Sequence, residues 1–246
     1  MNKHHTGIVQ SITPLSSDIF RVTVTLDNVP EIRAGQFVNV KVPGFTLRRP
    51  FGISHFDAKT VSFCFQVRGE GTRALAQVKV GSTLDLLLPL GNGFPSTHNT
   101  PSMTRGVPEA GCLKKIMLIG GGIGVFPLLP AAKDTYAFLG FRNKDSVVLE
   151  KDFRKVAKEV TIVTEGFVTD IAKKEFERIK PDAIFACGPH AMFKALKDFP
   201  CPVYISLEER MACGFGACIC CTADTVRGKE RVCCEGPVFL LSEVNI

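Results

Sequence analysis

Apolar and polar residues alternate along much of residues 1–90. In residues 20–26 every even-numbered position is apolar and every odd-numbered one is Arg or Thr. Residues 61–67 repeat this alternation, and residues 38–42 and 84–88 carry Val or Leu at every second position. A period of two with one apolar face is typical of antiparallel strands around a shared core. Several such strands, separated by turns that contain Gly or Pro, predict a small β-barrel or sandwich.

From residue 112 onward, short apolar runs are separated by helix-like segments. The apolar runs occupy residues 115–119, 137–141, 160–163, 183–187 and 203–207. Helices are expected from Val125 onward, over 170–178 with Thr169 or Asp170 as the N-cap, and over 190–197. This β-α-β order predicts a parallel sheet with helices on its faces. Residues 94–111, rich in Pro, Ser and Thr, are expected to be a linker or surface loop.

Composition limits the classes of protein that remain. At 246 residues the chain is long enough for two domains and a small appendage, and 45% hydrophobic with 22% charged residues is typical of globular proteins. The net charge of +6 is mild and scattered, which disfavours nucleic-acid binding. No run of apolar residues is long enough for a transmembrane helix, and the first residues, MNKHHTGIVQ, lack a secretory signal. We therefore expect a cytoplasmic protein without disulfides.

Six of the ten cysteines fall between Cys213 and Cys234. Three of them have the C-x4-C-x2-C spacing of plant-type [2Fe–2S] proteins, and a fourth follows after eleven residues; these are Cys213, Cys218, Cys221 and Cys233. Gly214 and Gly216 allow a loop to curl closely around a cluster, with backbone N–H groups directed at the sulfurs. A zinc site is the alternative, although zinc usually takes two C-x2-C pairs. Spacing alone leaves Cys234 open as the fourth ligand in place of Cys233.

Two segments of the β part are candidates for binding a flavin. Arg49 stands beside Pro50 in R-R-P-F-G-I-S, where a guanidinium can bind a diphosphate and the backbone of residues 51–53 can meet a flavin edge. Residues 65–72 end a strand in a Gly-rich turn of the kind that binds phosphate through N–H groups. A solvated turn is the alternative for R-R-P.

Residues 120–124 follow a strand and precede a helix, so their N–H groups can receive a pyrophosphate. The full G-x-G-x-x-G is absent, with Pro127 at the third small position, and a plain tight β-α turn is the alternative. Cys187 ends a later parallel strand, where ligands commonly bind. Its thiol is either a nicotinamide contact or buried filler.

Taken together, the motifs resemble those of the electron-transfer subunits of class 1B, NAD-linked dihydroorotate dehydrogenases, within the ferredoxin-reductase superfamily. They are R-R-P-F-G-I-S, G-E-G-T, P-L-G-N-G-F, G-G-G-I-G-V, G-F-R-N-K-D, A-C-G-P-H-A-M and E-R-M-A-C-G-F-G-A-C. The resemblance covers nearly the whole chain. It implies an antiparallel FAD-binding β-barrel (1–98), a parallel-sheet α/β domain that binds NAD (112–206) and a small C-terminal [2Fe–2S] module (207–246).

The resemblance also assigns roles to residues and to a partner. It implies that Cys213, Cys218, Cys221 and Cys233 hold the cluster. It implies FAD contacts at Arg49, Pro50, Phe51, Gly52, Phe65, Gln66, Val67, Gly71, Thr72 and Arg73. For NAD the candidates are Gly121, Gly122, Gly124 and Cys187. The implied partner is an FMN-containing catalytic subunit that oxidises dihydroorotate to orotate in pyrimidine biosynthesis, in a heterotetramer with two copies of each subunit. No catalytic acid or base is expected in this chain.

Three departures from the family pattern bear on these expectations. Gly52 stands where the family usually has Ser, so a hydroxyl that could bond the flavin is lost. Residues 129–138 are short for a full helix plus strand, and a loop expected between Glu165 and Gly166 is absent. Both shortenings concern the NAD domain alone. The alternatives are a reductase subunit of a sulfide, hydrogenase or NADP-linked system, and a zinc-stabilised module without catalytic function.

Overall fold

The computed structural model describes residues 3–95 and 113–246, so most of the expected linker at 94–111 lies outside the described residues. The first part is a closed antiparallel barrel with strand order β1-β2-β5-β4-β3-β6. Its strands are β1 (His4–Pro14), β2 (Ile19–Thr25), β3 (Phe37–Lys41), β4 (Arg49–Phe56), β5 (Thr60–Gln66) and β6 (Thr83–Leu90), with the short helix α1 (Glu70–Leu75) after β5. The alternation in the sequence closes into a barrel because every second side chain enters one core, as Val22, Val24, Phe63 and Leu86 do.

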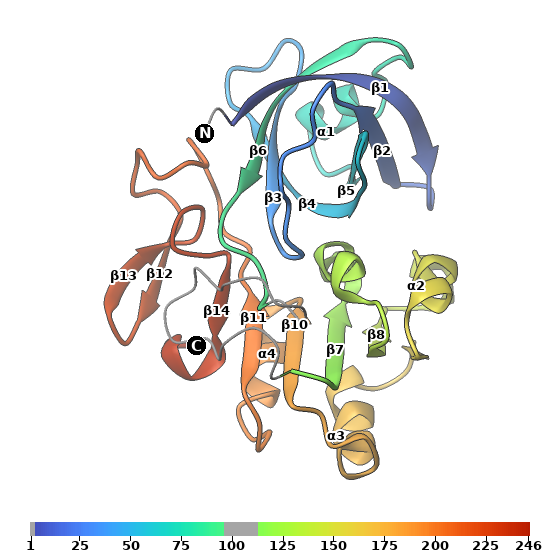
Figure 1. Ribbon diagram of the computed structural model, residues 1–246, viewed down its shortest axis with the longest axis vertical. Coiled ribbons are helices and arrows are strands. Elements are labelled where there is room, and N and C mark those ends of the chain that lie inside the picture. The colour runs from blue at the N-terminus through green and yellow to red at the C-terminus, as the bar shows by residue number, and fades with distance from the viewer. Residues whose placement is uncertain (1–2, 96–112) are drawn as a thin grey trace.

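The second part is a six-stranded sheet below the barrel (Figure 1), with strand order β14-β11-β10-β7-β8-β9. Five of its strands are parallel: β7 (Ile116–Gly121), β8 (Tyr136–Gly140), β9 (Glu159–Val163), β10 (Ala183–Cys187) and β11 (Val203–Ser206). The sixth, β14 (Val238–Leu240), pairs with β11 in the antiparallel direction. The predicted combination of an antiparallel barrel with an α/β sheet is confirmed, with this one antiparallel edge strand added.

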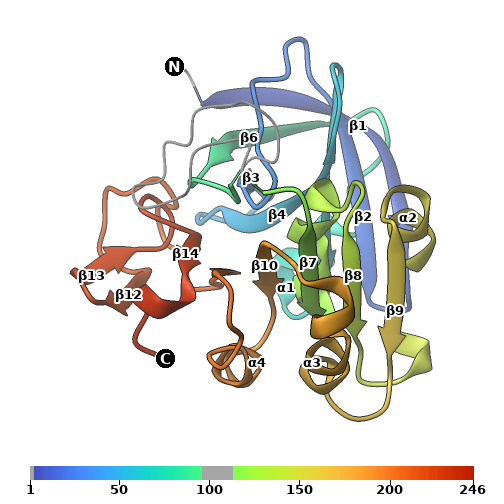
Figure 2. The same ribbon diagram turned by 60° about the horizontal axis from the view of Figure 1, so that its bottom comes forward.

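Helical segments cover both faces of the sheet. On one face, α3 (Val168–Ile179) and α4 (His190–Ala195) bury Ala172 and Phe193 against the strands. The other face is covered by the 3-10 helix η1 (Gly122–Ala131) and by α2 (Glu150–Val156), and the short 3-10 turn η2 (Lys144–Ser146) follows β8. Figure 2 shows α3 and α4 side by side below the strands.

Two expectations about helices were wrong in detail. The helix expected from Val125 is a 3-10 helix that begins at Gly122, because Pro127 and Pro130 lie inside it and cannot donate α-helical hydrogen bonds. It ends at Ala131, only a few residues before β8, which accounts for the short stretch at 129–138. Helix α3 begins at Val168 with Phe167 as its N-cap, so Thr169 and Asp170 lie in its first turn and do not cap it.

The last forty residues contribute a hairpin, β12 (Thr222–Thr225) with β13 (Gly228–Arg231), then β14 and the 3-10 turn η3 (Leu241–Glu243). Asn92, just beyond the barrel, holds this segment: its side-chain amide donates to the carbonyl oxygens of Glu235 (3.0 Å) and Val238 (2.7 Å). An ion pair of 2.9 Å joins Arg21 of β2 to Asp152 of α2. Across residues 3–95 and 113–246, no helix has the length and apolar character that crossing a membrane requires.

Candidate functional site

A cavity of about 300 Å³ lies between the barrel and the sheet. Six of the predicted flavin contacts line it from the barrel side: Pro50, Phe51, Gly52, Phe65, Gln66 and Thr72. Ile123, Phe126 and Pro127 of η1 form the opposite wall, together with Cys187. Aromatic and apolar walls with a few polar groups are typical of sites for flat cofactors, so this cavity fits the ring system of a flavin.

Arg49 lies beside this cavity, at the Gly-rich turn. Its guanidinium donates to the carbonyl oxygen of Leu47 at 2.6 Å and lies over the ring of Phe45. A Cβ atom added to Gly71 would lie 3.0 Å from both Nε and Nη2 of Arg49. The absence of a side chain at Gly71 therefore leaves room for the guanidinium, which is the arrangement that a diphosphate-binding arginine needs.

The turn that begins α1 is ordered by Thr72. Its hydroxyl oxygen accepts hydrogen bonds from the backbone N–H groups of Arg68 (2.9 Å) and Gly69 (3.1 Å). Four of the ten predicted flavin contacts do not line the cavity. Arg49 and Gly71 lie beside it as described, Val67 packs against the barrel core, and Arg73 is exposed on α1. The turn thus presents Thr72, and not Arg73, to the cavity.

Gly52, the position where the family usually has Ser, faces the 3-10 helix η1. A Cβ atom added there would lie 3.0 Å from Cβ of Pro127. Such a contact is tight, so a side chain at position 52 would require Pro127 to shift. The barrel strand and η1 therefore approach each other more closely here than a Ser would readily allow.

A second cavity, of about 480 Å³, lies at the carboxyl ends of β7, β8 and β10. Gly121, Gly122 and Gly124 line it, and it shares Gln66, Arg68, Ile123 and Glu208 with the first cavity. Read from the edge, the parallel strands follow the order β9-β8-β7-β10-β11, which is the 3-2-1-4-5 order of dinucleotide-binding folds. The cavity thus lies between β7 and β10, the first and fourth parallel strands along the chain. This is the switch point of the strand order, where such folds bind their ligand.

Gly124 is required at this switch point for reasons of space. A Cβ atom on Gly124 would lie 2.4 Å from the carbonyl oxygen of Cys187 and 2.8 Å from the nitrogen of Gly188. Real Cβ atoms do not approach backbone atoms this closely. The turn after β7 and the turn after β10 can therefore touch only because residue 124 has no side chain.

Cys187 is fully buried and lines the first cavity. Burial raises the pKa of its thiol well above the ordinary value; the negative charge of Glu208 adds to this, and a hydrogen bond with Ser206 opposes it. The thiol is therefore protonated at neutral pH. Cys187 is both buried in the core and part of the cavity wall. The sequence-based interpretations, as a buried core residue and as a nicotinamide contact, are therefore compatible.

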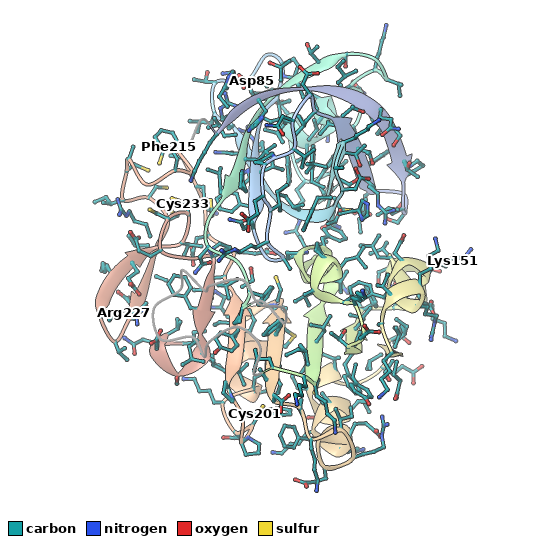
Figure 3. The ribbon with its side chains drawn as sticks, in the orientation of Figure 1. Asp85, Lys151, Cys201, Phe215, Arg227 and Cys233 are labelled. Carbon is teal, nitrogen blue, oxygen red and sulfur yellow. The ribbon has the colours of Figure 1, made fainter. Side chains whose placement is uncertain are left out.

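The four predicted ligand cysteines form two pairs. The sulfurs of Cys213 and Cys218 are 3.3 Å apart, and the thiol of Cys233 interacts with that of Cys221. Among the described residues, no three His, Cys, Asp or Glu side chains are placed so that they could hold one metal ion. Two pairs of thiols are the donor set that a two-iron cluster needs, with one pair for each iron. The thiols therefore fit a [2Fe–2S] cluster, and Figure 3 shows Cys233 inward of Phe215, which lies at the outer edge of the molecule.

Backbone N–H groups are directed at these sulfurs, as the sequence predicts. Burial raises the pKa of the Cys213 thiol, but hydrogen bonds from the backbone of Phe215, Cys218 and Ala217 outweigh it and lower the pKa to about 6. For Cys233, burial and the neighbouring Cys221 raise the pKa to about 12, and the backbone of Gly216 opposes them. Gly214 and Gly216 have φ angles of +75° and +90°, which lets the loop curl around the sulfurs.

We call residues 213–221 the cysteine loop. The loop contacts the barrel at Asn39 of β3, whose side-chain amide donates a hydrogen bond of 3.0 Å to the carbonyl oxygen of Cys213. On its other side, Arg231 donates to the carbonyl oxygen of Gly216 and forms an ion pair with Glu235. Cys221 and Cys233 are buried, whereas Cys220 and Cys234 are exposed. That Cys233, and not Cys234, is the fourth ligand stays a prediction. The burial of Cys233 and the exposure of Cys234 favour it.

Sequence reasoning missed several residues of the two cavities. Arg68 and Glu208 stand where the cavities join, and Arg142, Ser146 and His190 line the second one. Burial raises the pKa of the Glu208 carboxyl, and the positive charge of Arg68 opposes this. Arg142 and His190 lie in motifs that carry the family resemblance, and Arg68 directly precedes G-E-G-T, so these motifs were the available signal.

Comparison with known proteins agrees with this architecture. The iron–sulfur cluster binding domain of dihydroorotate dehydrogenase B matches residues 208–245. The chain is 36% identical to the electron transfer subunit of dihydroorotate dehydrogenase B (NAD(+)) of Fusobacterium nucleatum, over 97% of each chain. It is 39% identical to the protein of the same name from Bacillus caldolyticus, over 92% of each chain.

Solved structures show the same fold. The structure of an NADH-dependent reduced ferredoxin-NADP oxidoreductase superposes with a TM-score of 0.81 at 25% identity, covering 97% of this chain and 89% of that one. Phthalate dioxygenase reductase superposes with a TM-score of 0.66 at 15% identity, covering 94% of each chain. The second likeness concerns the fold alone.

Proposed function

Since the chain belongs to the family of electron transfer subunits of NAD-linked dihydroorotate dehydrogenase B, we propose that it carries electrons between a catalytic subunit that oxidises dihydroorotate to orotate and NAD⁺. FAD in the first cavity, a [2Fe–2S] cluster on the cysteine loop and NAD in the second cavity are the groups it would use. A flavin converts between two-electron hydride transfer and the one-electron transfer of an iron–sulfur cluster.

One observation carries this proposal: the first cavity is lined by residues that lie close to the ligand cysteines along the chain. Met211, two residues before Cys213, lines the cavity, and so does Pro237, which follows Cys233 along the chain. The second cavity adjoins the first and shares Arg68 and Glu208 with it. The first cavity thus borders both the second cavity and the segments that carry the ligand cysteines.

The residues of the chain bind and position; none acts on dihydroorotate. Arg49 and the turn at Gly71 and Thr72 would hold the flavin diphosphate, and Phe51 and Phe65 would contact the ring system. Pro127 and Phe126 cover the opposite side and exclude water. The protonated thiol of Cys187 adds no charge where a nicotinamide would approach the flavin.

The catalytic partner would dock on the outer face of the cysteine loop. Phe215 and Ile219 are apolar yet 54% and 82% exposed there. Exposed apolar groups beside a redox centre are suited to burial in a protein interface. The partner is an FMN-containing catalytic subunit, and two copies of each subunit assemble into a heterotetramer in the cytoplasm.

The test is reconstitution of the full chain with and without its catalytic partner. The chain alone is expected to bind one FAD and about two irons, to show an EPR signal after reduction, and to have its flavin absorption bleached by NADH. Oxidation of dihydroorotate with NAD⁺ is expected only after the partner is added.

Two outcomes would overturn the proposal. A preparation with about one zinc, no iron and no flavin would favour the zinc-stabilised module. Intact FAD and cluster with copurification of a different FMN-containing or hydrogenase subunit, and no dihydroorotate oxidation, would assign the chain to another reductase system.

A further inference from the structure

Arg231 links the two chain segments that carry the predicted cluster ligands. It ends β13, two residues before Cys233, and its Nη1 donates to the carbonyl oxygen of Gly216 in the cysteine loop. Gly216 has a φ angle of +90°, and a Cβ atom there would lie 3.1 Å from the sulfur of Cys234 and 3.6 Å from Nη1 of Arg231. The guanidinium thus reaches the backbone of the loop at a residue without a side chain.

Glu235 fixes the direction of this guanidinium. Its carboxylate accepts hydrogen bonds from Nε of Arg231 at 3.1 Å, from Nη2, and from the backbone N–H of Arg231 at 2.7 Å. A pair with two parallel hydrogen bonds holds the planar guanidinium in one orientation, which the ammonium of a Lys would not do. Because Nε and Nη2 are bound to Glu235, Nη1 remains for the carbonyl oxygen of Gly216.

The peptide unit between Gly216 and Ala217 connects Arg231 to a ligand sulfur. The bond is trans, so the C=O of Gly216 and the N–H of Ala217 point in opposite directions. Arg231 donates to this carbonyl oxygen, and the backbone of Ala217 is hydrogen-bonded to the thiol of Cys213. A cation at the oxygen end of a peptide unit polarises it and strengthens the hydrogen bond at its N–H end. The charge of Arg231 therefore acts on the sulfur of Cys213 through one peptide unit.

The preceding peptide unit serves the other pair of thiols, since the backbone of Gly216 is hydrogen-bonded to the thiol of Cys233. Fixing the carbonyl group of Gly216 restrains the peptide units on both sides of this residue. One contact of Arg231 therefore orients N–H groups toward both Cys213 and Cys233. Hydrogen bonds to the sulfurs and the local charge are what set the reduction potential of an iron–sulfur cluster.

We propose that Arg231 is a positioning residue that raises the reduction potential of the cluster through the peptide unit of Gly216 and Ala217. The proposal rests on the proposed function in one respect, namely that the four ligand cysteines hold a [2Fe–2S] cluster. Reduction adds one negative charge to such a cluster, and polarised N–H groups at the sulfurs favour the form with the greater negative charge. The carboxylate of Glu235 balances the guanidinium, so the effect comes from the direction of the peptide unit and not from the net charge.

The test measures the midpoint potential of the cluster by EPR-monitored redox titration of the reconstituted full chain. Arg231→Met removes the donor and is expected to make the cluster about three- to tenfold harder to reduce, the scale of one charge screened by solvent. The double substitution Arg231→Met with Glu235→Gln removes both charges of the pair and so keeps the net charge. It is still expected to lower the potential, because the donor to Gly216 is lost. Iron content and melting temperature report whether each variant keeps its cluster and its fold.

Arg227→Met is the matched control. Arg227 lies in the turn of the same hairpin, forms ion pairs of 2.9 Å with Glu230 and Glu243, and is well apart from Cys233 in Figure 3. The substitution removes the same charge and is expected to leave the potential unchanged. If Arg231→Met loses its iron, Arg231→Lys carries the test, because an ammonium keeps the charge and a donor for Gly216 but not the paired hydrogen bonds to Glu235. It is expected to keep the iron and to lower the potential by a smaller amount.

Several results would overturn the proposal and leave the proposed function standing. They are a wild-type potential in an iron-loaded Arg231 variant, an equal shift in Arg227→Met, and a return of the double variant to the wild-type potential, which would assign the effect to net charge. Loss of iron from both Arg231→Met and Arg231→Lys would make the residue a structural one and would also overturn it. A wild-type chain that takes up no iron would refute the proposal together with the cluster.

Discussion

The side-chain amide of Asn39 in the barrel donates a hydrogen bond of 3.0 Å to the carbonyl oxygen of Cys213 in the cysteine loop. Asn39 has no exposed surface, and its amide lies so close to Gly214 that a Cβ atom there would be 2.2 Å from Nδ2. The loop therefore rests on the barrel through one buried amide and one residue that has to be Gly.

We expect Asn39→Asp to weaken the contact between the cysteine loop and the barrel. The substitution keeps the shape of the side chain but replaces the donor by an oxygen, which leaves the carbonyl of Cys213 without its partner at a cost of about 1–3 kcal/mol. Iron content and the free energy of unfolding in urea should both fall. Asn28→Asp, at an exposed position, is the control and should change neither. Full iron content and wild-type stability in the Asn39 variant would contradict the role of this bond.

Cys233 and Cys234 should respond differently to substitution. The Cys233 thiol is buried beside Cys221, whereas Cys234 is exposed. We therefore expect Cys233→Ser to lose the cluster and Cys234→Ser to keep it, as measured by iron content and visible absorption after anaerobic reconstitution. The reverse pattern would make Cys234 the fourth ligand.

Gly124→Ala should separate the two turns that meet at the switch point. The added Cβ would lie 2.4 Å from the carbonyl oxygen of Cys187, and forced overpacking of this kind costs about 1–3 kcal/mol. A lower melting temperature and weaker nucleotide binding are expected. Gly69→Ala is a suitable comparison, since its Cβ would meet nothing within 4 Å and its backbone is extended at φ −157°. Equal effects of the two substitutions would argue against close contact at Gly124.

The turn between β4 and β5 is expected to lose stability in acid. The carboxylate of Asp57 accepts hydrogen bonds from the backbone N–H groups of Lys59 and Thr60, both 2.8 Å long, and from the Thr60 hydroxyl, and His55 lies 3.7 Å away. The backbone N–H of Lys59 contributes most to lowering the pKa of Asp57 from 3.8 to about 2. Because the folded pKa is depressed, the stabilisation is fully present above pH 3.8 and is lost as pH falls towards 2.

Asp57→Ala should accordingly lower the melting temperature at neutral pH. This difference from wild type should shrink between pH 4 and pH 2. Asp27→Ala, at an exposed position, should show no such trend. A difference that is independent of pH would exclude the carboxylate as its source.

The barrel and the parallel strands could be predicted because burial on one face imposes the period of two at residues 20–26 and the short apolar runs at 183–187. Asn39 could not be placed in the same way. Its position in the alternation predicts an outward, solvated side chain, and it is buried because a loop more than 170 residues later covers it. Contacts between distant segments leave no periodic signal in either segment.

Other differences between the sequence-based expectations and the structure also arise from contacts or residues that a periodic pattern does not show. β14 has three residues, too few for a recognisable pattern, and exists because β11 offers an edge to pair with. The 3-10 helix η1 replaces an expected helix where two Pro residues interrupt it. In the candidate site, the cysteine spacing was informative because a cluster constrains it, whereas Arg142 and Glu208 acquire their place only when separate turns meet at the cavities.

β14 pairs with the edge of the sheet, Asn92 is hydrogen-bonded to Glu235 before β14 and to Val238 at its start, and the cysteine loop of the same module rests on the barrel. The C-terminal residues therefore connect the six-stranded sheet to the β-barrel. A rotation of the sheet away from the barrel would have to break either the β11–β14 pairing or the hydrogen bond between Asn39 and Cys213. The position of the ligand thiols is therefore tied to the way the sheet lies against the barrel.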